Sequence, residues 1–280
     1  MTVCGSVGRR RDRAILGPMP DWNPSQYLRF AGERTRPCRD LVARIDAAAP
    51  ATVMDLGCGP GNSTAVLAER WPGAAITGLD SSADMLATAC RDLPGIRWEQ
   101  GDIAEWASNG GPAFDVVFSN AALQWVPEHR AVFPALLARA GILAVQIPTA
   151  SDAPAQRAIR ELAASAEWRS RFTAPVVDWH SHGPAFYYDA LAGRAAALDI
   201  WETEYMHVLD GPEGIVAWYR GTGLRPFLEA LPEEHRPEFL AQYLETIRPA
   251  YPPRADGRIL FAFRRLFLIG YNRHWRPDCP

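Results

Sequence analysis

The sequence contains no lysine, so its 29 permanently cationic side chains are all arginine. This absence excludes Schiff-base chemistry on a lysine amine and the phosphate-binding lysine of a P-loop. Arginine suits carboxylate groups, because its planar guanidinium can hold both oxygens at once. The formal net charge of −3 and the dispersed arginines are not typical of a nucleic-acid-binding protein. We therefore expect a small-molecule partner and no nucleic acid.

Cysteine is scarce, and long apolar runs are missing. The five cysteines are scattered without a CxxC pair, so their spacing predicts neither a disulfide framework nor a zinc site. A reducing cytoplasm fits this usage best. No run approaches the roughly 18 apolar residues of a transmembrane helix, so we expect no membrane partner. His180-Ser181-His182 has metal-like spacing but no acidic or cysteine companion nearby, and we interpret it as a loop without metal.

The length of 280 residues allows one large domain that carries insertions. Residues 1–20 hold four arginines but no apolar segment of signal-peptide length, and we expect them to be a disordered extension. The remainder, 21–280, is expected to form a single domain. Its predicted parts are a helical arm at 21–50, a ligand-binding core at 51–148, late strands at 198–209 and 258–272, and lid insertions at 149–197 and 210–257.

Strands and helices alternate within the core. The segments 52–56, 75–79, 96–100, 114–119 and 142–146 predict strands, the first of them buried, and 62–71, 82–92 and 128–139 predict helices. This alternation is typical of an α/β fold with a parallel sheet covered by helices on both faces. Two helix starts are expected, at Thr35-Arg36-Pro37, since proline tolerates the first turn, and after Ser81 as an N-cap.

The string Asp55-Leu56-Gly57-Cys58-Gly59-Pro60-Gly61 lies between a predicted strand and a predicted helix. Its glycines permit a sharp turn and let a ligand approach the backbone. The helix behind them presents free N–H groups to an anionic group. A bare GxGxxG match would be weak, and Asn62 departs from it. The longer string with Asp55 resembles the first motif of class I methyltransferases, in which the acid organises the loop and the cofactor's amino group.

Two further acids follow the next two predicted strands. Asp80 stands about 20 residues after the glycines, where doubly wound folds place an acid for the ribose hydroxyls. Asp102 is placed to accept a hydrogen bond from an adenine amino group. Each could instead be a solvent-exposed turn acid. The segment Ser119 to Trp125 follows the fourth strand, where cofactor and acceptor should meet, unless it is a plain loop-to-helix junction.

From Asp21 to about Ile269 the chain resembles the trans-aconitate 2-methyltransferases. The glycine loop alone identifies only the superfamily, and the N-terminal arm and late segments carry the narrower resemblance. The matching strings are Asp21-Trp22-Asn23-Pro24, Tyr27-Leu28, Glu33 to Pro37, Asp55 to Thr64, Arg70-Trp71-Pro72, Gly78 to Ser82, Leu123-Gln124-Trp125, Leu143 to Pro148, Asp199-Ile200-Trp201, Thr222 to Pro226, Tyr251-Pro252 and Arg265-Leu266-Phe267.

The resemblance implies a Rossmann-like fold with a mostly parallel seven-stranded sheet and helical lid insertions. It implies transfer of a methyl group from S-adenosylmethionine to one carboxylate of trans-aconitate, which yields the monomethyl ester and S-adenosylhomocysteine. The expected cofactor-binding residues are Asp55, Gly57, Cys58, Gly59, Gly61, Asp80, Ser81, Met85, Asp102, Ile103, Asn120 and Ala121.

A tricarboxylate acceptor needs cations and apolar walls. The candidate cations are Arg34, Arg36, Arg225, Arg264 and Arg265, and the candidate walls are Trp22, Tyr27, Trp125 and Tyr205. Each arginine could instead form a surface ion pair, and each aromatic could be core. Because a carboxylate is ionised at neutral pH, we expect catalysis by alignment and desolvation without a proton-transfer residue. Two alternatives stay open: another small carboxylic acid or natural-product acceptor, or a non-catalytic binding protein with this fold. The oligomeric state is left open as well.

Overall fold

The computed structural model describes residues 31–149, 152–176 and 179–274, and its centre is a seven-stranded sheet. The strands are β1 (Thr52–Leu56), β2 (Ala75–Asp80), β3 (Arg97–Gln100), β4 (Phe114–Asn120), β5 (Ala140–Pro148), β6 (Ala195–Leu209) and β7 (Ile259–Asn272). Their order is β3-β2-β1-β4-β5-β7-β6; β1 to β5 pair in parallel, and β7 runs antiparallel to β5 and β6. The predicted mostly parallel sheet is therefore confirmed.

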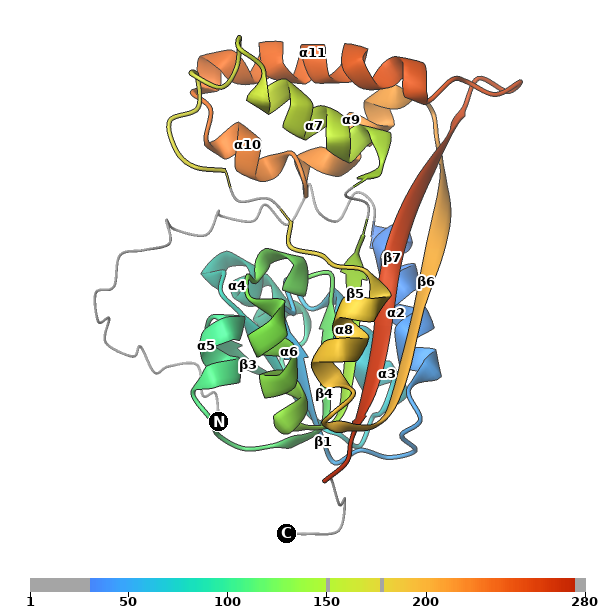
Figure 1. Ribbon diagram of the computed structural model, residues 1–280. Helices are drawn as coiled ribbons and strands as arrows, with labels where there is room; N and C mark the ends of the chain where they lie inside the picture. The colour runs from blue at the N-terminus through green and yellow to red at the C-terminus, as the bar shows by residue number, and fades with distance from the viewer. Residues whose placement is uncertain (1–30, 150–151, 177–178, 275–280) are drawn as a thin grey trace.

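Helices cover both faces of this sheet (Figure 1). One face packs against α2 (Ala31–Arg44) and α3 (Asn62–Arg70), and the other against α5 (Ile103–Ser108), α6 (His129–Ala138) and α8 (Pro184–Leu191). Helix α4 (Ala83–Asp92) packs against β2 and β3. Double coverage explains why most residues of β1, β4 and β5 are buried and apolar, since neither face of these strands meets water.

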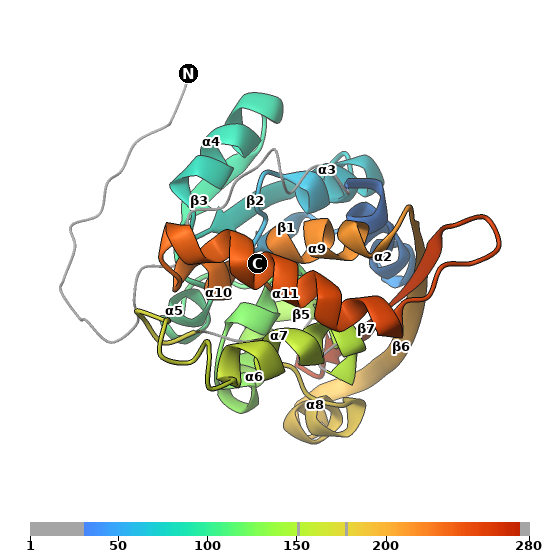
Figure 2. The same cartoon turned by 90° about the horizontal axis from the view of Figure 1, so that it is seen from above.

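A second helical layer lies above the sheet. It consists of α7 (Pro154–Ala164), α9 (Pro212–Arg220), α10 (Arg225–Glu229), α11 (Arg236–Ile247) and the short helices η3 (Glu233–His235) and η4 (Arg248–Ala250). In Figure 2, which looks down on the molecule, α9 and α11 lie over the region of β1 and β5. This lid has its own apolar core, which also includes Phe261 and Phe263 from the far part of β7. The β6–β7 hairpin therefore joins sheet and lid.

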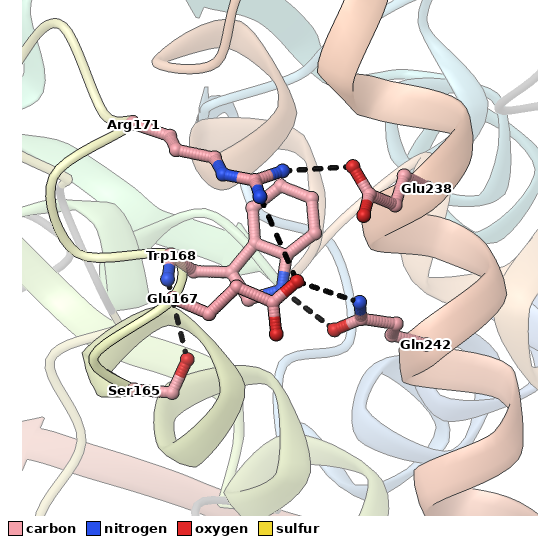
Figure 3. A network of polar contacts seen from close by, with 6 residues as sticks. All are labelled: Ser165, Glu167, Trp168, Arg171, Glu238 and Gln242. Carbon is pink, nitrogen blue, oxygen red and sulfur yellow. Dashed lines mark hydrogen bonds and ion pairs between the residues drawn. The ribbon is translucent and has the colours of Figure 1, made fainter.

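Polar contacts fasten the turn that follows α7 to α11 (Figure 3). The Arg171 guanidinium forms an ion pair with Glu238 at 2.7 Å and lies over the ring of Trp168 at 4.5 Å. The indole N–H of Trp168 donates to Gln242 at 2.7 Å, and the amide of Gln242 donates to Glu167 at 3.0 Å. The lid is thus internally braced.

Several predicted boundaries differ in the structure. Pro37 lies inside α2, so Thr35-Arg36-Pro37 is not a helix start. The proline is tolerated there because the carbonyl that loses its hydrogen bond belongs to Glu33, which is exposed to water. Ser82, not Ser81, caps α4, because its hydroxyl accepts from the Met85 amide.

The predicted lid insertion at 149–197 divides between two places. Helix α7 joins the lid, whereas α8 packs against α6 on the sheet. The predicted extension at 1–20 and residues 21–30 of the arm lie outside the described residues. In the part of the chain that the structure describes, no helix is long and apolar enough to cross a membrane.

Candidate cofactor and acceptor site

The glycine loop connects β1 to α3 and needs left-handed backbone at Gly57, Gly59 and Gly61, whose φ angles are 71°, 55° and 93°. A Cβ on Gly57 would lie 2.2 Å from the Cβ of Ala122. A Cβ on Gly59 would meet no heavy atom within 4 Å, so the loop opens onto space at that point. The loop therefore packs tightly against Ala122 at Gly57 and leaves space for a ligand at Gly59.

Asp55 lies fully buried near the end of β1. The hydroxyls of Ser63 and Thr64 donate to its Oδ2 at 2.7 and 2.6 Å, whereas its Oδ1 is buried without a hydrogen-bond partner among the described residues. Burial raises the pKa of the Asp55 carboxyl to about 6. The hydrogen bonds from the two hydroxyls lower this pKa in part, and the negative charge of Asp80 raises it further. A cationic amino group at Oδ1 would satisfy this carboxylate, so the residue fits S-adenosylmethionine.

Asp80, at the end of β2, already organises the glycine loop. Its Oδ2 accepts from the Gly59 amide at 2.8 Å and its Oδ1 from the Ser82 amide at 2.9 Å. Burial raises the pKa of Asp80, and these backbone bonds oppose that shift. The sequence suggested a ribose contact, and the structure adds this loop-ordering role.

Asp102 caps α5. Its Oδ1 accepts from the amides of Ala104 and Glu105 at 2.7 and 3.0 Å. Such a cap stabilises a helix by about 1 kcal/mol. Both bonds end on one oxygen, which leaves the other carboxylate oxygen for a role in ligand binding. Nearby, the Ile103 side chain lies 3.5 Å from the Cβ position of Gly57, at the edge of the loop.

Two sulfur-containing candidates are buried near the loop. The thiol of Cys58 lies 3.0 Å from the Cβ position of Gly78, and burial raises its pKa. Met85 is 2 % exposed in the first turn of α4. Ser81 is half-buried at the end of β2. Their contacts with a cofactor stay predictions.

The turn after β4 brings the cofactor loop and the acceptor side together. Ala121 has a φ of 55°, a left-handed conformation that costs a non-glycine residue about 1 kcal/mol or more. The Ala121 amide donates to the Gln146 carbonyl at 3.0 Å, and the Gln124 side chain donates back to the Ala121 carbonyl at 2.6 Å. These bonds hold the strained residue and press Ala122 against Gly57. Asn120 ends β4 beside them, and its Oδ1 is buried without a partner among the described residues.

Arg265 lies where the sheet and the lid meet. On β7 it is opposite Pro148, the last residue of β5, and it is 3 % exposed. Its Nη1 donates to the side-chain oxygen of Gln146 at 3.0 Å, and its guanidinium lies 4.9 Å from the ring centroid of Phe263. Phe263 belongs to the lid core, whereas Leu266 belongs to the core of the sheet. A buried cation is therefore built into this border.

Other polar groups gather on the same face of the β6–β7 hairpin. Tyr205 and His207 have stacked rings, and the Tyr205 hydroxyl donates to Asp40 of α2 at 2.6 Å. The guanidinium of Arg36 lies 5.2 Å from the Tyr205 ring centroid. Burial, with the charges of Arg265 and Arg36, lowers the pKa of His207 to about 4. The imidazole is hence neutral near pH 7, and the cations of this group are the two arginines.

Aromatic side chains line the path from the β4 turn to the lid. The rings of Trp125 and Trp179 meet edge to face at 6.1 Å, and Trp179 stacks on Tyr219 of α9 at 6.3 Å. Trp179 also meets Phe263 of β7 at 6.3 Å. These residues connect the core, the loop before α8 and the lid into one wall.

Other acceptor candidates do not join this group. Arg264 forms an ion pair with Glu204 at 3.7 Å and has a 56 % exposed side chain. Neighbouring residues of a strand point to opposite faces, which corrects the expectation that Arg264 and Arg265 serve one acceptor. Arg225 forms an ion pair with Glu229 at 2.6 Å within α10. Trp22, Tyr27 and the side chain of Arg34 lie outside the described part of the chain.

Sequence reasoning missed Gln146 and Trp179. A signal for Gln146 was available, because it is the one polar residue in the apolar run Ile142 to Pro148, and a buried polar side chain calls for a partner. Trp179 had no comparable signal. Among the described residues, no group of three or more His, Cys, Asp and Glu side chains could hold a metal ion.

The glycine loop after β1, the acids at the ends of β1 and β2 and just after β3, and the antiparallel last strand define a class I S-adenosylmethionine-dependent methyltransferase. A family model described as "Methyltransferase domain" matches residues 53–140. The chain is 48% identical over 254 residues to a trans-aconitate 2-methyltransferase of Azoarcus sp. strain BH72, covering 90% of this chain and 99% of that relative. It is 50% identical over 255 residues to one of Methylobacterium nodulans, covering 90% and 98%. The chain belongs to the trans-aconitate 2-methyltransferase family.

Solved structures agree on the fold. The YcgJ protein of Bacillus subtilis superposes with a TM-score of 0.57 at 15% identity, covering 86% of this chain and 100% of that one. A phosphoethanolamine N-methyltransferase 2 of Haemonchus contortus, in complex with S-adenosyl-L-methionine, gives a TM-score of 0.54 at 14% identity, covering 89% of this chain and 56% of that one. At such identities the likeness concerns the fold alone.

Proposed function

We propose that this protein methylates one carboxylate of trans-aconitate, forming the monomethyl ester and S-adenosylhomocysteine. The observation that carries the proposal is the buried Arg265, held by Gln146 at the border of sheet and lid. A cation in that position suits an acceptor with several carboxylates. The names of the relatives that match nine-tenths of this chain support the choice of acid.

For the cofactor we propose the loop and the strand ends around it. Asp55 receives the amino group at Oδ1, and the backbone at Gly59 borders the cofactor where no side chain fills the space. The remaining contacts are assigned to Gly57, Cys58, Gly61, Asp80, Ser81, Met85, Asp102, Ile103, Asn120 and Ala121. When bound, S-adenosylmethionine supplies an electrophilic methyl group on a sulfonium sulfur.

The acceptor needs no base, because its carboxylate is ionised at neutral pH. Its oxygen forms the new bond to the methyl carbon as the carbon–sulfur bond breaks, and no proton moves. The protein aligns and desolvates the reacting groups: Arg265 and Arg36 hold the other carboxylates, and the wall of Trp125 and Trp179 excludes water. Alignment of this kind can supply several kcal/mol.

Arg265 and Arg264 offer a matched test of the acceptor site. Arg265→Gln should raise the KM for trans-aconitate about tenfold or more, because a charged hydrogen bond is worth about 1.5–3 kcal/mol. Arg264→Gln, on the exposed face, should stay within about twofold of the wild type. Steady-state kinetics with each substrate varied measures both, and the KM for S-adenosylmethionine should not change. Equal effects of the two variants would contradict the assignment.

We also infer a cytoplasmic location and a small-molecule partner without nucleic acid. Free thiols at Cys38, Cys58 and Cys90 support a reducing compartment. Surface arginines such as Arg39 and Arg171 are paired with glutamates, which supports the absence of a nucleic-acid surface.

A further inference from the structure

The side chain of His129, the first residue of α6, makes two hydrogen bonds in the core. It is 1 % exposed, with Nε2 2.9 Å from the Leu123 carbonyl oxygen and Nδ1 2.9 Å from the Tyr187 hydroxyl. Because a carbonyl can only accept, Nε2 carries the ring proton, and Nδ1 accepts from Tyr187. Burial lowers the pKa of His129, against the hydrogen bond to the Leu123 carbonyl and with a smaller contribution from His182 and His180, so the neutral ring is favoured. The tyrosine thus orients the ring, and the ring holds the carbonyl.

Leu123 begins the short helix η1 (Leu123–Trp125), within the turn that joins the two halves of the site. At one end of this turn Ala122 packs against Gly57, and at the other Trp125 meets Trp179. The backbone amide of His180 adds a bond to the Gln124 carbonyl at 2.7 Å. A shift of the turn would therefore move the acceptor wall relative to the cofactor loop.

We propose that His129 and Tyr187 are a positioning pair that fixes residues 121–125 for methyl transfer. His129 acts through the Leu123 carbonyl and touches neither substrate, so it is a positioning residue and moves no proton in the reaction. The strained Ala121 makes the restraint necessary, because the turn relaxes toward ordinary backbone angles when it is released. The proposal rests on the methyltransferase activity assigned above and not on which acid is the acceptor.

Two substitutions distinguish the hydrogen bond that Nε2 of His129 makes to Leu123 from the one that Nδ1 makes to Tyr187. In His129→Gln the terminal amide nitrogen reaches the place of Nε2 and can still donate to Leu123. In His129→Asn it reaches only the place of Nδ1, so the bond to the turn is lost. We expect His129→Asn to lower kcat about tenfold or more, since misplacement near 1 Å can cost up to about a hundredfold. His129→Gln should recover most of the rate, and Tyr187→Phe should fall between them.

A second measurement needs no turnover. Hydrogen–deuterium exchange of the peptide that spans residues 121–125 should be faster in His129→Asn than in the wild type and near the wild-type rate in His129→Gln. Binding of S-adenosylhomocysteine, measured by calorimetry, should change less than kcat in both variants. Thermal melting identifies a variant that fails to fold, in which case Tyr187→Phe takes its place.

The outcomes distinguish this inference from the acceptor assignment. If the wild type methylates another acid and not trans-aconitate, the acceptor proposal fails and the variants are compared on that acid. If the wild type methylates none of the acids, the hydrogen exchange of residues 121–125 alone tests the positioning role of His129. Equal rate losses in the Gln and Asn variants, or unchanged exchange at 121–125 in His129→Asn, would overturn the positioning role.

Discussion

Gly57 shows how a single missing Cβ holds two parts of the site together. Its left-handed backbone turns the chain after β1, and Ala122 from the β4 turn occupies the place of its side chain. The glycine-rich string predicted the sharp turn from the sequence. It could not predict Ala122 as the neighbour, since that contact depends on the strained angle at Ala121.

Gly57→Ala should weaken both folding and cofactor binding. The left-handed angle alone costs about 1–2 kcal/mol, and the clash with Ala122 adds to it. Urea denaturation and calorimetric titration with S-adenosylhomocysteine measure the two effects. Gly73→Ala is the matched control, because a Cβ there meets no atom within 4 Å. Equal stability in the two variants would count against this description of the loop.

The proposed role of Asp55 predicts that cofactor binding depends on pH. The pKa of Asp55 is about 6, above the ordinary value of 3.8, because burial disfavours the ionised carboxylate. Above pH 6 the carboxylate is ionised, and a bound cation stabilises it. The affinity for S-adenosylhomocysteine should therefore fall as the pH drops through about 6. Asp55→Asn should bind weakly with little pH dependence between about pH 7 and 5. A wild-type affinity that stays constant across this range would contradict the role of Asp55.

The late hairpin is the element that most shapes the acceptor side. Alternation along β6 places Tyr205 and His207 toward the buried face and leaves Met206 and Val208 exposed. Period-two patterning predicted this strand from the sequence. The length of β6 and the pairing that aligns Arg265 with Pro148 could not be predicted, because register depends on partners far away in the chain.

The buried imidazole of His207 should make the protein less stable in mild acid. Its pKa is lowered to about 4 in the folded protein, so between about pH 6.5 and 4 the imidazole is protonated in the unfolded chain but neutral in the folded one. The free energy of unfolding should consequently decline as the pH falls from about 6.5 toward 4. Urea denaturation should show a smaller decline in His207→Phe than in the wild type. In His274→Phe, a substitution at an exposed position, the free energy of unfolding should decline with pH as it does in the wild type.

At the scale of the whole molecule, the candidate site lies between the α/β core and the helical lid, which the sequence predicts to different degrees. The core from β1 to β5 is built from local signals, which is why the glycine loop and the alternation of strands and helices predicted it closely. The lid core gathers α7 from one segment of the chain and the consecutive helices α9, α10 and α11 from another, together with Phe261 and Phe263 of β7. Contacts such as Trp179 with Tyr219 join loop to lid and leave no local signature.

This division has a functional consequence. The residues proposed for the cofactor all belong to the core, whereas the proposed acceptor residues Arg265 and Trp179 come from the hairpin and from a loop that packs against the lid. Changes in those segments can alter the acceptor without disturbing the cofactor. The proposal therefore assigns the class of reaction to residues of the core and the choice of acid to the hairpin and the segments that pack against the lid.

The most direct test of that choice is a rate comparison with methyl-labelled S-adenosylmethionine and a panel of small di- and tricarboxylates. We predict that the label appears in a monomethyl ester and that kcat/KM is highest for trans-aconitate. A higher kcat/KM for another acid would preserve the methyltransferase and contradict the acceptor. Cofactor binding without ester formation from any acid would contradict the enzymatic role itself.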